Sequence, residues 1–442
     1  MFGYSMVQMV RAHAEKLDRP LRGEILNLYK PFKRTPCFLH KMFEGVLKKA
    51  RKIPVIIEFE KDGFETGCHQ VTGIMNKHVR NGIRQEYSRI SCCSANVTAT
   101  SLEEMLKSCS HIKRVYLNRK VHALLNTAVP AAKAKNVIRN NTVLTGKGVT
   151  IAVIDTGIYP HPDVSGRIIG FKDFINNRTA PYDDNGHGTH CAGDAAGNGS
   201  ASGHKYAGPA PEANLIGVKV LDNSGSGSLE TVMQGIEWCL QYNEGNARKK
   251  IDIISMSLGS PAQDYGNEDA DPMVKLVEEA WAAGIVVCAA AGNEGPGART
   301  IASPGISDKV ITVGAFDDKN TAGRGDDEAA SFSSRGPTIY NISKPDILAP
   351  GVNIVSLRSP NSYLDRWQKS SRVENNYFVL SGTSMATPIC AGVVALIKQH
   401  KPNASPQQIK QWLVNGADKV PGMDPNIYGA GYLNAENSIL QK

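Results

Sequence analysis

The sequence predicts an α/β fold with a mostly parallel sheet, preceded by a small α/β domain. After residue 148, apolar runs rich in Val and Ile alternate with helical segments. Apolar strands interleaved with helices are typical of a parallel sheet covered on both faces. Before residue 126, shorter strands and helices alternate in a β-α-β-α-β order. A chain of 442 residues has room for both units.

The larger unit is predicted from its alternating strands and helices. Its strands are expected at residues 149–158, 214–221, 251–259, 284–293 and 309–316. Its helices are expected at residues 187–197, 228–246, 271–283, 384–400 and 405–416. The last helix opens with Ser405, Pro406 and Gln408, a capping-box pattern with proline at the first helical position.

The smaller unit is predicted at residues 51–125. Strands are expected at 53–60, 83–92 and 112–125, helices at 65–80 and 101–109, with room for a further strand in the middle. The second helix opens with Ser101 and Glu104, another capping-box pattern. Residues 1–50 are expected to be an N-terminal extension without an assigned role. The small, polar segment 126–144 is expected to be a linker, and 145–442 the large domain.

The two predicted units differ in net charge. Residues 1–125 hold 22 Lys and Arg against 11 Asp and Glu, and the rest of the chain holds 28 against 31. A basic segment is compatible with nucleic-acid binding, but no dense Lys/Arg run with interleaved aromatic residues is present. Attraction between two parts of the same chain explains the basic segment better, and no nucleic-acid partner is expected.

Cysteine usage and hydropathy indicate the compartment. Nine cysteines, an odd number without a CxxC pair, lie partly in apolar stretches and indicate reduced thiols in a cytoplasmic protein. The N-terminal stretch has no apolar core of signal-peptide length. No run of ~18 apolar residues occurs, so we expect no membrane span and no membrane partner.

Asp155 stands where the first expected strand of the larger unit ends, between Ile154 and Thr156. A turn-capping aspartate explains such a residue without any chemistry. In an open parallel sheet, however, reactive groups gather at the carboxyl ends of the strands. Asp155 is therefore a candidate for either role.

Two histidines and a cysteine occur at an expected helix start, in the stretch NGHGTHCAG. His187 and Cys191 are four residues apart and share a helix face, so a zinc site that includes His190 is one interpretation. Structural zinc sites need four ligands in paired short spacings, and no partner CxxC or HxxxH is present. We therefore interpret His190 as a core histidine, and His187, between two glycines, as open to approach.

Ser384 lies in the stretch GTSMA, directly before an apolar helix. The unpaired N–H groups and positive dipole end of a helix N-terminus favour developing negative charge. An N-cap serine would explain the hydroxyl, but not the small residues that leave it open to approach. Asp155, His187 and Ser384 follow in the chain order of subtilisin, and the absence of a GxSxG elbow counts against an esterase.

Three motifs carry a resemblance to the subtilisin-like serine peptidases, the subtilases. They are AVIDTGI, NGHGTHCAG and GTSMATP, and the resemblance spans about residues 145–435. It implies a three-layer subtilisin-like fold and a serine endopeptidase that works through an acyl-enzyme. By resemblance, Asp155 orients the general base His187, and Ser384 is the nucleophile. Asn293, in the motif AGNEG, would complete an oxyanion hole with the backbone N–H of Ser384.

The resemblance also implies how a peptide substrate binds. Ser257, Leu258 and Gly259 resemble the strand that pairs with an extended peptide, and Ser226 and Gly227 the strand on its other side. Main-chain pairing of this kind gives affinity with broad sequence tolerance. The wall of the S1 pocket would consist of small residues that suit large apolar P1 side chains: Ala289, Ala290 and Gly292.

Other stretches carry further implications of the resemblance. Asp163 and the loop 197–206 occupy positions where many subtilases bind calcium, so a structural calcium is an option, whereas the chemistry requires no cofactor. Cys191 resembles the free cysteine of some subtilases and predicts sensitivity to mercurials. The basic insertion 357–377 either shapes the primed side of the cleft or is an ordinary surface loop. The acidic stretch 264–272 is expected to be a solvated loop.

Residues from about 50 to 125 resemble the N-terminal propeptide of subtilases. The whole chain is most similar to the intracellular AprX-type subtilases of bacilli. This implies a self-inhibited zymogen with protein or peptide substrates and its own propeptide as a partner. Autoprocessing is then expected in the region 124–132. Two alternatives stay open: a catalytically silent peptide-binding module on the same fold, and a zinc hydrolase that uses His187, His190 and Cys191.

Overall fold

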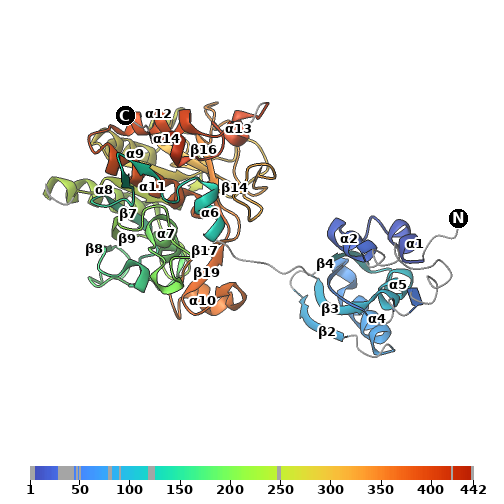
Figure 1. The fold of residues 1–442 in the computed structure, drawn as a ribbon. Coiled ribbons are helices and arrows are strands. Elements are labelled where there is room, and N and C mark those ends of the chain that lie inside the picture. Colours follow the sequence, from blue (N-terminus) through green and yellow to red (C-terminus); the bar gives the residue numbers. More distant parts are fainter. Residues whose placement is uncertain are drawn as a thin grey trace. The chain divides into compact units, whose positions relative to one another are not determined.

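A computed structural model divides the chain into two compact units, Met1–Val121 and His122–Lys442 (Figure 1). The described residues are 5–27, 44–45, 48, 51–77, 82–88, 91–117, 125–245, 250–419 and 422–439. The ends of several predicted elements, Cys37 and most of residues 28–50 lie outside these ranges. The mixed α/β architecture, with a mostly parallel sheet in the second unit, confirms the predicted fold class.

An antiparallel sheet in the order β2-β3-β1-β4 forms the first unit. Along β1, buried positions alternate with exposed or half-buried ones, which directs Ile53, Val55 and Ile57 into the core. The further strand expected in the middle of this unit is β3. The elements are β1 Lys52–Phe59, α4 Phe64–Asn76, β2 Gly82–Tyr87, β3 Cys92–Thr98, α5 Ala99–Ser108 and β4 Ile112–Leu117.

The capping box of α5 lies earlier in the chain than predicted. Thr98, not Ser101, is the N-cap residue. The hydroxyl of Thr98 accepts from Ser101 N over 3.3 Å, and the hydroxyl of Ser101 accepts from Thr98 N over 3.0 Å. Ser101 therefore closes the box as its second member, a role in which the prediction had placed Glu104.

The described part of the N-terminal segment belongs to the core of the first unit. It forms two helices, α1 Ser5–Ala12 and α2 Arg19–Asn27. Their side chains Met6 and Leu21 are buried in the same cluster as the strands. Between the helices, Leu17 forms a bridge with Val115 of β4, and Val115 N donates to the carbonyl oxygen of Lys16 over 2.7 Å. This segment thus covers an otherwise unpaired edge of β4.

A mostly parallel eight-stranded sheet forms the centre of the second unit. Its order is β15-β14-β12-β10-β7-β9-β8, with β16 also paired to β14. The strands β7 and β12 are buried at every position, as expected where helices cover both faces. The strands are β7 Thr150–Asp155, β8 Ile168–Asp173, β9 Asn214–Lys219, β10 Ile253–Met256, β12 Val286–Ala290, β14 Ile311–Asp317, β15 Glu328–Ala329 and β16 Ile347–Pro350.

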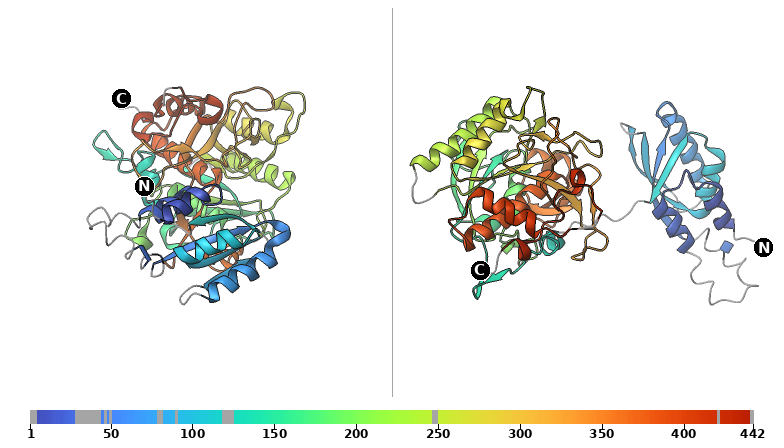
Figure 2. Two further views of the ribbon diagram at one scale, coloured as in Figure 1. Left: turned by 90° about the vertical axis from the view of Figure 1, so that its right-hand side faces the viewer. Right: turned by 90° about the horizontal axis from the view of Figure 1, so that it is seen from above.

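The helices of the second unit pack in pairs, α7 with α11 and α8 with α9 (Figures 1 and 2). Ser405 and Gln408 cap α12 as predicted, with Pro406 as its first residue. In the described part of the chain, no helix has the length and apolarity needed to cross a bilayer. The helices are α7 His187–Ala196, α8 Leu229–Gly245, α9 Pro272–Ala282, α11 Thr383–His400, α12 Pro406–Gly416, α13 Pro425–Tyr428 and α14 Ala435–Ser438.

The segment expected as a linker, 126–144, is packed into the second unit. Ala128 and Ala132 are fully buried in its core, and Ala435 N donates to the carbonyl oxygen of Ala132 over 3.0 Å. Small residues allow this close packing, whereas the prediction took the small, polar composition as a sign of a linker. The segment contains α6 Leu125–Ala131 and the hairpin strands β5 Ile138–Arg139 and β6 Thr142–Val143.

The insertion 357–377 is an ordered part of the second unit. The buried carboxylate of Asp365 accepts from Arg358 Nε over 2.5 Å and from Arg372 Nε over 2.7 Å, which closes the insertion on itself. Leu364 N donates to the carbonyl oxygen of Asn185 over 3.0 Å, close to His187. The elements are β17 Ile354–Leu357, α10 Tyr363–Trp367, β18 Arg372–Val373 and β19 Tyr377–Leu380.

Candidate active site

Asp155 is the last residue of β7, which lies between β9 and β10 in the sheet. Its carboxylate is fully buried, and Oδ1 accepts from Thr156 N over 2.7 Å and from His187 Nδ1 over 2.8 Å. Gly157 then turns the chain with φ +116°, at a point where a Cβ would lie 2.2 Å from the carbonyl oxygen of Tyr182. The strand end therefore presents a buried carboxylate to one imidazole.

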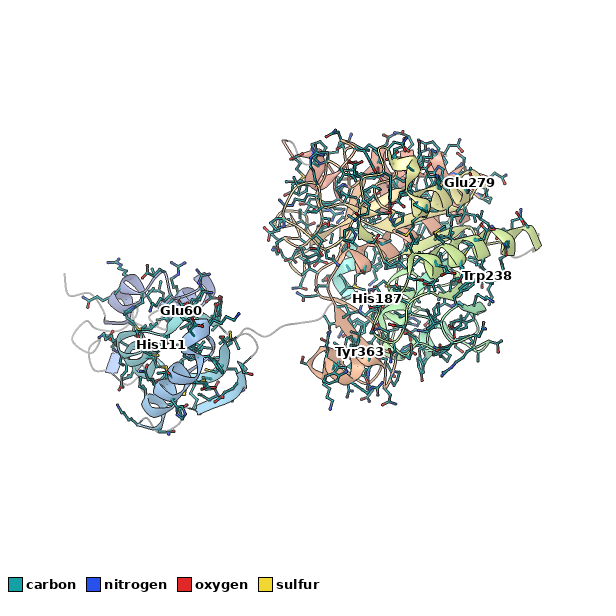
Figure 3. The ribbon with its side chains drawn as sticks, turned by 180° about the vertical axis from the view of Figure 1, so that it is seen from behind. Glu60, His111, His187, Trp238, Glu279 and Tyr363 are labelled. Carbon is teal, nitrogen blue, oxygen red and sulfur yellow. The ribbon has the colours of Figure 1, made fainter. Side chains whose placement is uncertain are left out.

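His187 is the first residue of α7 and keeps 24 % of its side chain exposed (Figure 3). Gly186 precedes it with φ +106°, a backbone conformation that favours glycine. The buried carboxylate of Asp183 fastens this helix start by accepting from Gly186 N over 2.8 Å and from Thr189 N over 2.9 Å. Asp155 Oδ1 holds Nδ1 of His187, and the side chain of His187 also lines a cavity of about 890 Å³.

The surroundings of His187 shift its proton affinity. Burial of the imidazole disfavours its charged form, but the contacts with the Asp155 carboxylate and with Cys191 together outweigh burial and raise the pKa of His187 well above 6.5. Cys191 Sγ lies 3.8 Å from His187 Nδ1. Burial raises the pKa of the Cys191 thiol to about 11, so this neighbour is uncharged at neutral pH. Of the two neighbours, Asp155 is therefore the one that brings a charged group to His187.

Ser384 is the second residue of α11 and lines the same cavity as His187. Its hydroxyl donates to the carbonyl oxygen of Ser257 over 3.1 Å, so in this conformation it does not donate to His187. Ser257 Oγ in turn donates to the carbonyl oxygen of Ser384 over 2.7 Å. Catalytic hydrogen bonds are often long or misaligned without substrate and tighten when it binds.

Asn293 lies beside the start of α11 and lines the cavity. Its Oδ1 accepts from Thr383 N over 2.9 Å and from Thr383 Oγ1 over 3.1 Å. These bonds fix the orientation of the carboxamide, and Nδ2 has no acceptor among the described residues of the chain. The amide therefore holds its N–H groups available for a negatively charged oxygen beside Ser384.

A cavity of about 890 Å³ joins these residues with the predicted substrate strands. His187, Asn293 and Ser384 line it. Ala289 does not: it is fully buried in β12, whereas its neighbour Ala290 lines the cavity. Successive side chains of a strand point to opposite faces, so the side chains of the two alanines do not both face this cavity. The other predicted substrate-binding residues that line the cavity are Ser226, Gly227, Ser257, Leu258, Gly259, Ala290 and Gly292.

Other lining residues were absent from the sequence prediction. Leu364, from α10 of the insertion, lines the cavity, which favours the cleft over the surface-loop alternative. Leu221 ends a predicted strand, and Ala302 belongs to a short strand paired with the segment after Gly259. The position of Leu221 at a strand end was the one available signal. Nothing in the sequence of the insertion distinguished Leu364 from a surface residue.

His190 belongs to the core and not to a metal site with His187. Its Nδ1 lies 2.9 Å from Asp194 Oδ2, and its Nε2 faces the carbonyl oxygens of Ile354 and Phe378 at 3.1 Å each. Both ring nitrogens are thus engaged, so His190 cannot share a zinc ion with His187 and Cys191. This geometry removes the zinc-hydrolase alternative.

The surroundings of Asp163 do not fit the calcium ligand that the resemblance implies. The carboxylate is fully buried, and Oδ1 accepts from Ala201 N over 2.8 Å and from Ser200 Oγ over 3.1 Å. Oδ2 accepts from Tyr377 Oη over 2.8 Å. Calcium needs a shell of oxygen acceptors, whereas this carboxylate faces hydrogen-bond donors. Protein donors take the place of a cation at Asp163.

Comparison with known proteins agrees with this geometry. The sequence profile of the Subtilase family matches residues 146–431. Serine protease AprX of Bacillus subtilis (strain 168) is 63 % identical over 439 residues, which cover 99 % of each chain. M-protease of Shouchella clausii (strain KSM-K16) is 39 % identical over 67 % of this chain and 66 % of its own. Subtilisin Savinase of Lederbergia lenta is 39 % identical over 67 % of this chain and 93 % of its own. The chain therefore belongs to the subtilase family and is a serine endopeptidase.

Proposed function

We propose that the enzyme cleaves peptide bonds through an acyl-enzyme formed on Ser384. His187 takes the proton of the Ser384 hydroxyl and returns it to the leaving amine, while Asp155 stabilises the imidazolium. Asn293 Nδ2 and the backbone N–H of Ser384 stabilise the oxyanion. One observation carries this proposal: His187 bonds to buried Asp155 over 2.8 Å and lines the same cavity as Ser384 and Asn293. All these groups belong to the chain, so the chemistry needs no cofactor.

The substrate that we propose is an extended protein or peptide segment. The backbone segments 226–227 and 257–259 both line the cavity and can pair with such a segment. Ala290 and Gly292 leave room for a large apolar P1 side chain. Leu364 adds an apolar surface near His187. Affinity from main-chain pairing, with one apolar pocket, supports broad specificity.

We propose that the first unit is a propeptide that inhibits the second unit. It is a separate compact unit with its own core, and its basic charge complements the slightly acidic remainder of the chain. Cleavage within residues 128–132 would require unpacking, because Ala128 and Ala132 are fully buried. We therefore place processing before α6, at the N-terminal end of the region 124–132 or upstream of it.

We also propose that the enzyme works in the cytoplasm. Buried thiols without a disulfide occur throughout the described residues: Cys68, Cys93, Cys109, Cys191, Cys239, Cys288 and Cys390. Free thiols are typical of compartments in which disulfides are kept reduced. Fractionation of the producing cells, with activity recovered mainly from the medium, would contradict this location.

The test of the proposed function compares the wild-type chain with Ser384→Ala in casein hydrolysis. The wild type is expected to cleave casein, and the variant to lose activity by several orders of magnitude while it folds normally. A variant that cleaves casein like the wild type would disprove the role of Ser384. A folded wild type that binds peptides without cleaving them would instead support a silent peptide-binding module.

A further inference from the structure

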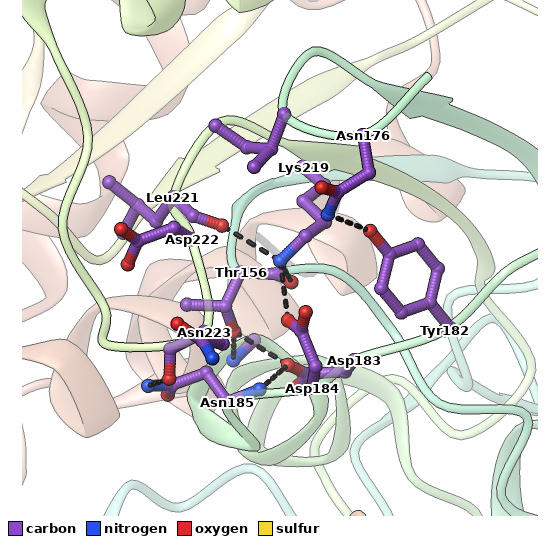
Figure 4. Close-up of polar contacts among 12 residues, drawn as sticks. Thr156, Asn176, Tyr182, Asp183, Asp184, Asn185, Lys219, Leu221, Asp222 and Asn223 are labelled. Atoms are coloured by element: carbon purple, nitrogen blue, oxygen red, sulfur yellow. Dashed lines mark hydrogen bonds and ion pairs between the residues drawn. The ribbon is translucent and has the colours of Figure 1, made fainter. Parts of the chain in front are cut away.

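Lys219, the last residue of β9, carries a fully buried ammonium group beside the catalytic pair. It lies opposite Asp155 in the register of β9 against β7. An ammonium group has three protons, and burying it without partners is costly. Lys219 Nζ donates to the carbonyl oxygen of Thr156 over 2.7 Å, to Asp184 Oδ1 over 2.7 Å and to the carbonyl oxygen of Leu221 over 2.8 Å (Figure 4). All three protons therefore have acceptors.

The three acceptors belong to three different segments of the active site. Thr156 directly follows Asp155. Asp184 lies in the segment that leads into α7 and its first residue, His187. Leu221 lines the substrate cavity. The ammonium group of Lys219 thus joins the strand end that holds Asp155, the segment that leads to His187 and one edge of the substrate cavity.

Neighbouring contacts reinforce the same junction. The carboxylate of Asp183 accepts from Thr156 Oγ1 over 2.9 Å, which also joins the segment after Asp155 to the segment before His187. On its outer side, the carbonyl oxygen of Asp184 accepts from Tyr363 N over 2.8 Å. Lys219 of the sheet therefore holds the segment 183–185 on one side, and Tyr363 of α10 holds it on the other.

We propose that Lys219 is a positioning residue for peptide hydrolysis, which holds Asp155 and His187 in the geometry of their hydrogen bond. This inference rests on the roles proposed above for Asp155 and His187. Lys219 touches neither the substrate nor the reacting atoms. Its effect comes through the segments that it joins, because a misplacement of about 1 Å in a catalytic group can lower the rate about 10²-fold.

A second buried lysine provides a matched control in the same unit. Lys344 is 1 % exposed, and its Nζ donates to Asp346 Oδ2 over 2.7 Å and to the carbonyl oxygen of Val310 over 3.1 Å. Both lysines are buried and pair with a carboxylate over 2.7 Å. Neither lysine lines the substrate cavity, and neither of the acceptors of Lys344 does so. Loss of either ammonium group removes a buried cation from its ion pair, and of these two lysines Lys219 is the one that joins the active-site segments.

The experiment compares Lys219→Met and Lys344→Met in the full-length chain. A trace of affinity-tagged wild type processes both variants and is then removed, and mass spectrometry confirms equal processing. Both variants are expected to show a lower Tm. Lys219→Met is expected to lose about 10–100-fold in kcat, with KM changed less than about 3-fold, and Lys344→Met to keep its kcat. Equal kcat values for the two variants would overturn the proposal.

Asp184→Ala keeps the test decisive if Lys219→Met does not fold, because Asp184 is 35 % exposed. It is expected to lower kcat, because it breaks the same connection. Where Lys219→Met does fold, the double variant should lose no more than the stronger single variant. Unchanged kcat in Asp184→Ala, or additive losses in the double variant, would contradict the proposal. Ser384→Ala, assayed alongside, distinguishes a failure of the proposed function from a failure of the role of Lys219. If Ser384→Ala kept its activity, the proposed function itself would be refuted.

Discussion

His187 Nδ1 lies 2.8 Å from Asp155 Oδ1, although 32 residues separate the two in sequence. A buried strand end holds the carboxylate, and the first turn of α7 holds the ring. The second carboxylate oxygen, Asp155 Oδ2, is buried without a hydrogen-bond partner among the described residues. The negative charge of Asp155 is therefore compensated mainly by the imidazole, which ties the ionisation of His187 to this one contact.

The first prediction concerns the pH dependence of activity. His187 must be neutral to accept a proton, and its contacts with Asp155 and Cys191 raise its pKa well above 6.5, so kcat/KM should fall as the pH drops through a value above 6.5. Asp155→Asn removes the negative charge, so the acidic limb should move to lower pH while kcat falls by about 10⁴-fold. Rate profiles of both proteins with one peptide substrate test this, and an unshifted acidic limb would contradict it.

The second prediction concerns Asn293. Asn293→Ala removes the Nδ2 donor and should lower kcat by about 10²–10³-fold with a small change in KM. The same change also removes the two bonds to Thr383, so Tm must be measured in parallel. Asn415→Ala, on an exposed position of α12, serves as the control and should leave kcat unchanged. A mutant whose KM alone changes would show that Asn293 only helps to bind the substrate.

The third prediction concerns Tyr377 and Asp163. Tyr377→Phe leaves Asp163 Oδ2 without its donor in a fully buried place, which should cost about 1–3 kcal/mol in the free energy of unfolding. Because protein donors surround Asp163, calcium should not change the Tm of the wild type through this carboxylate. Thermal unfolding with calcium and with a chelator measures both effects. A calcium-dependent rise in Tm that Asp163→Asn abolishes would contradict the account.

The fourth prediction concerns Glu268. Burial, together with the charges of Asp308 and Glu278, raises its pKa from 4.5 to about 7. A carboxyl whose pKa is raised by folding contributes stability below its unfolded pKa, and this contribution is lost as the pH rises through about 7. The free energy of unfolding of Glu268→Gln, relative to that of the wild type, should therefore be larger at about pH 8 than at about pH 4.5. Denaturant unfolding of both proteins at the two pH values measures this difference in free energy. An equal gain at the two pH values would contradict a raised pKa of Glu268.

The places of the three candidate catalytic residues in the fold could be predicted, because each lies at the end of a strongly patterned element. Asp155 ends an apolar strand, and His187 and Ser384 open helices, so motif and local structure agreed. Ala289 was predicted in the S1 wall but is buried and does not line the cavity, because the motif around AGNEG does not show which side chains of a strand face it. Strand periodicity separates Ala289 from Ala290 only once the facing elements are known.

Two other features depended on contacts between distant segments. The small residues of 126–144 resemble a linker in composition, yet Ala128 and Ala132 pack in the core because the surrounding elements leave space of that size. Lys219 follows a run of apolar residues without any motif of its own. Its three acceptors come from separate segments, so local sequence could not predict its burial.

The central claim is that Ser384 is activated by His187 as a nucleophile. Labelling of the processed enzyme with phenylmethylsulfonyl fluoride, followed by peptide mapping with mass spectrometry, tests it most directly. We predict one sulfonyl adduct on the peptide that carries Ser384, formed much more slowly in a His187→Ala variant. No adduct on a folded, processed enzyme, or an adduct on another serine at the same rate in both proteins, would contradict the account.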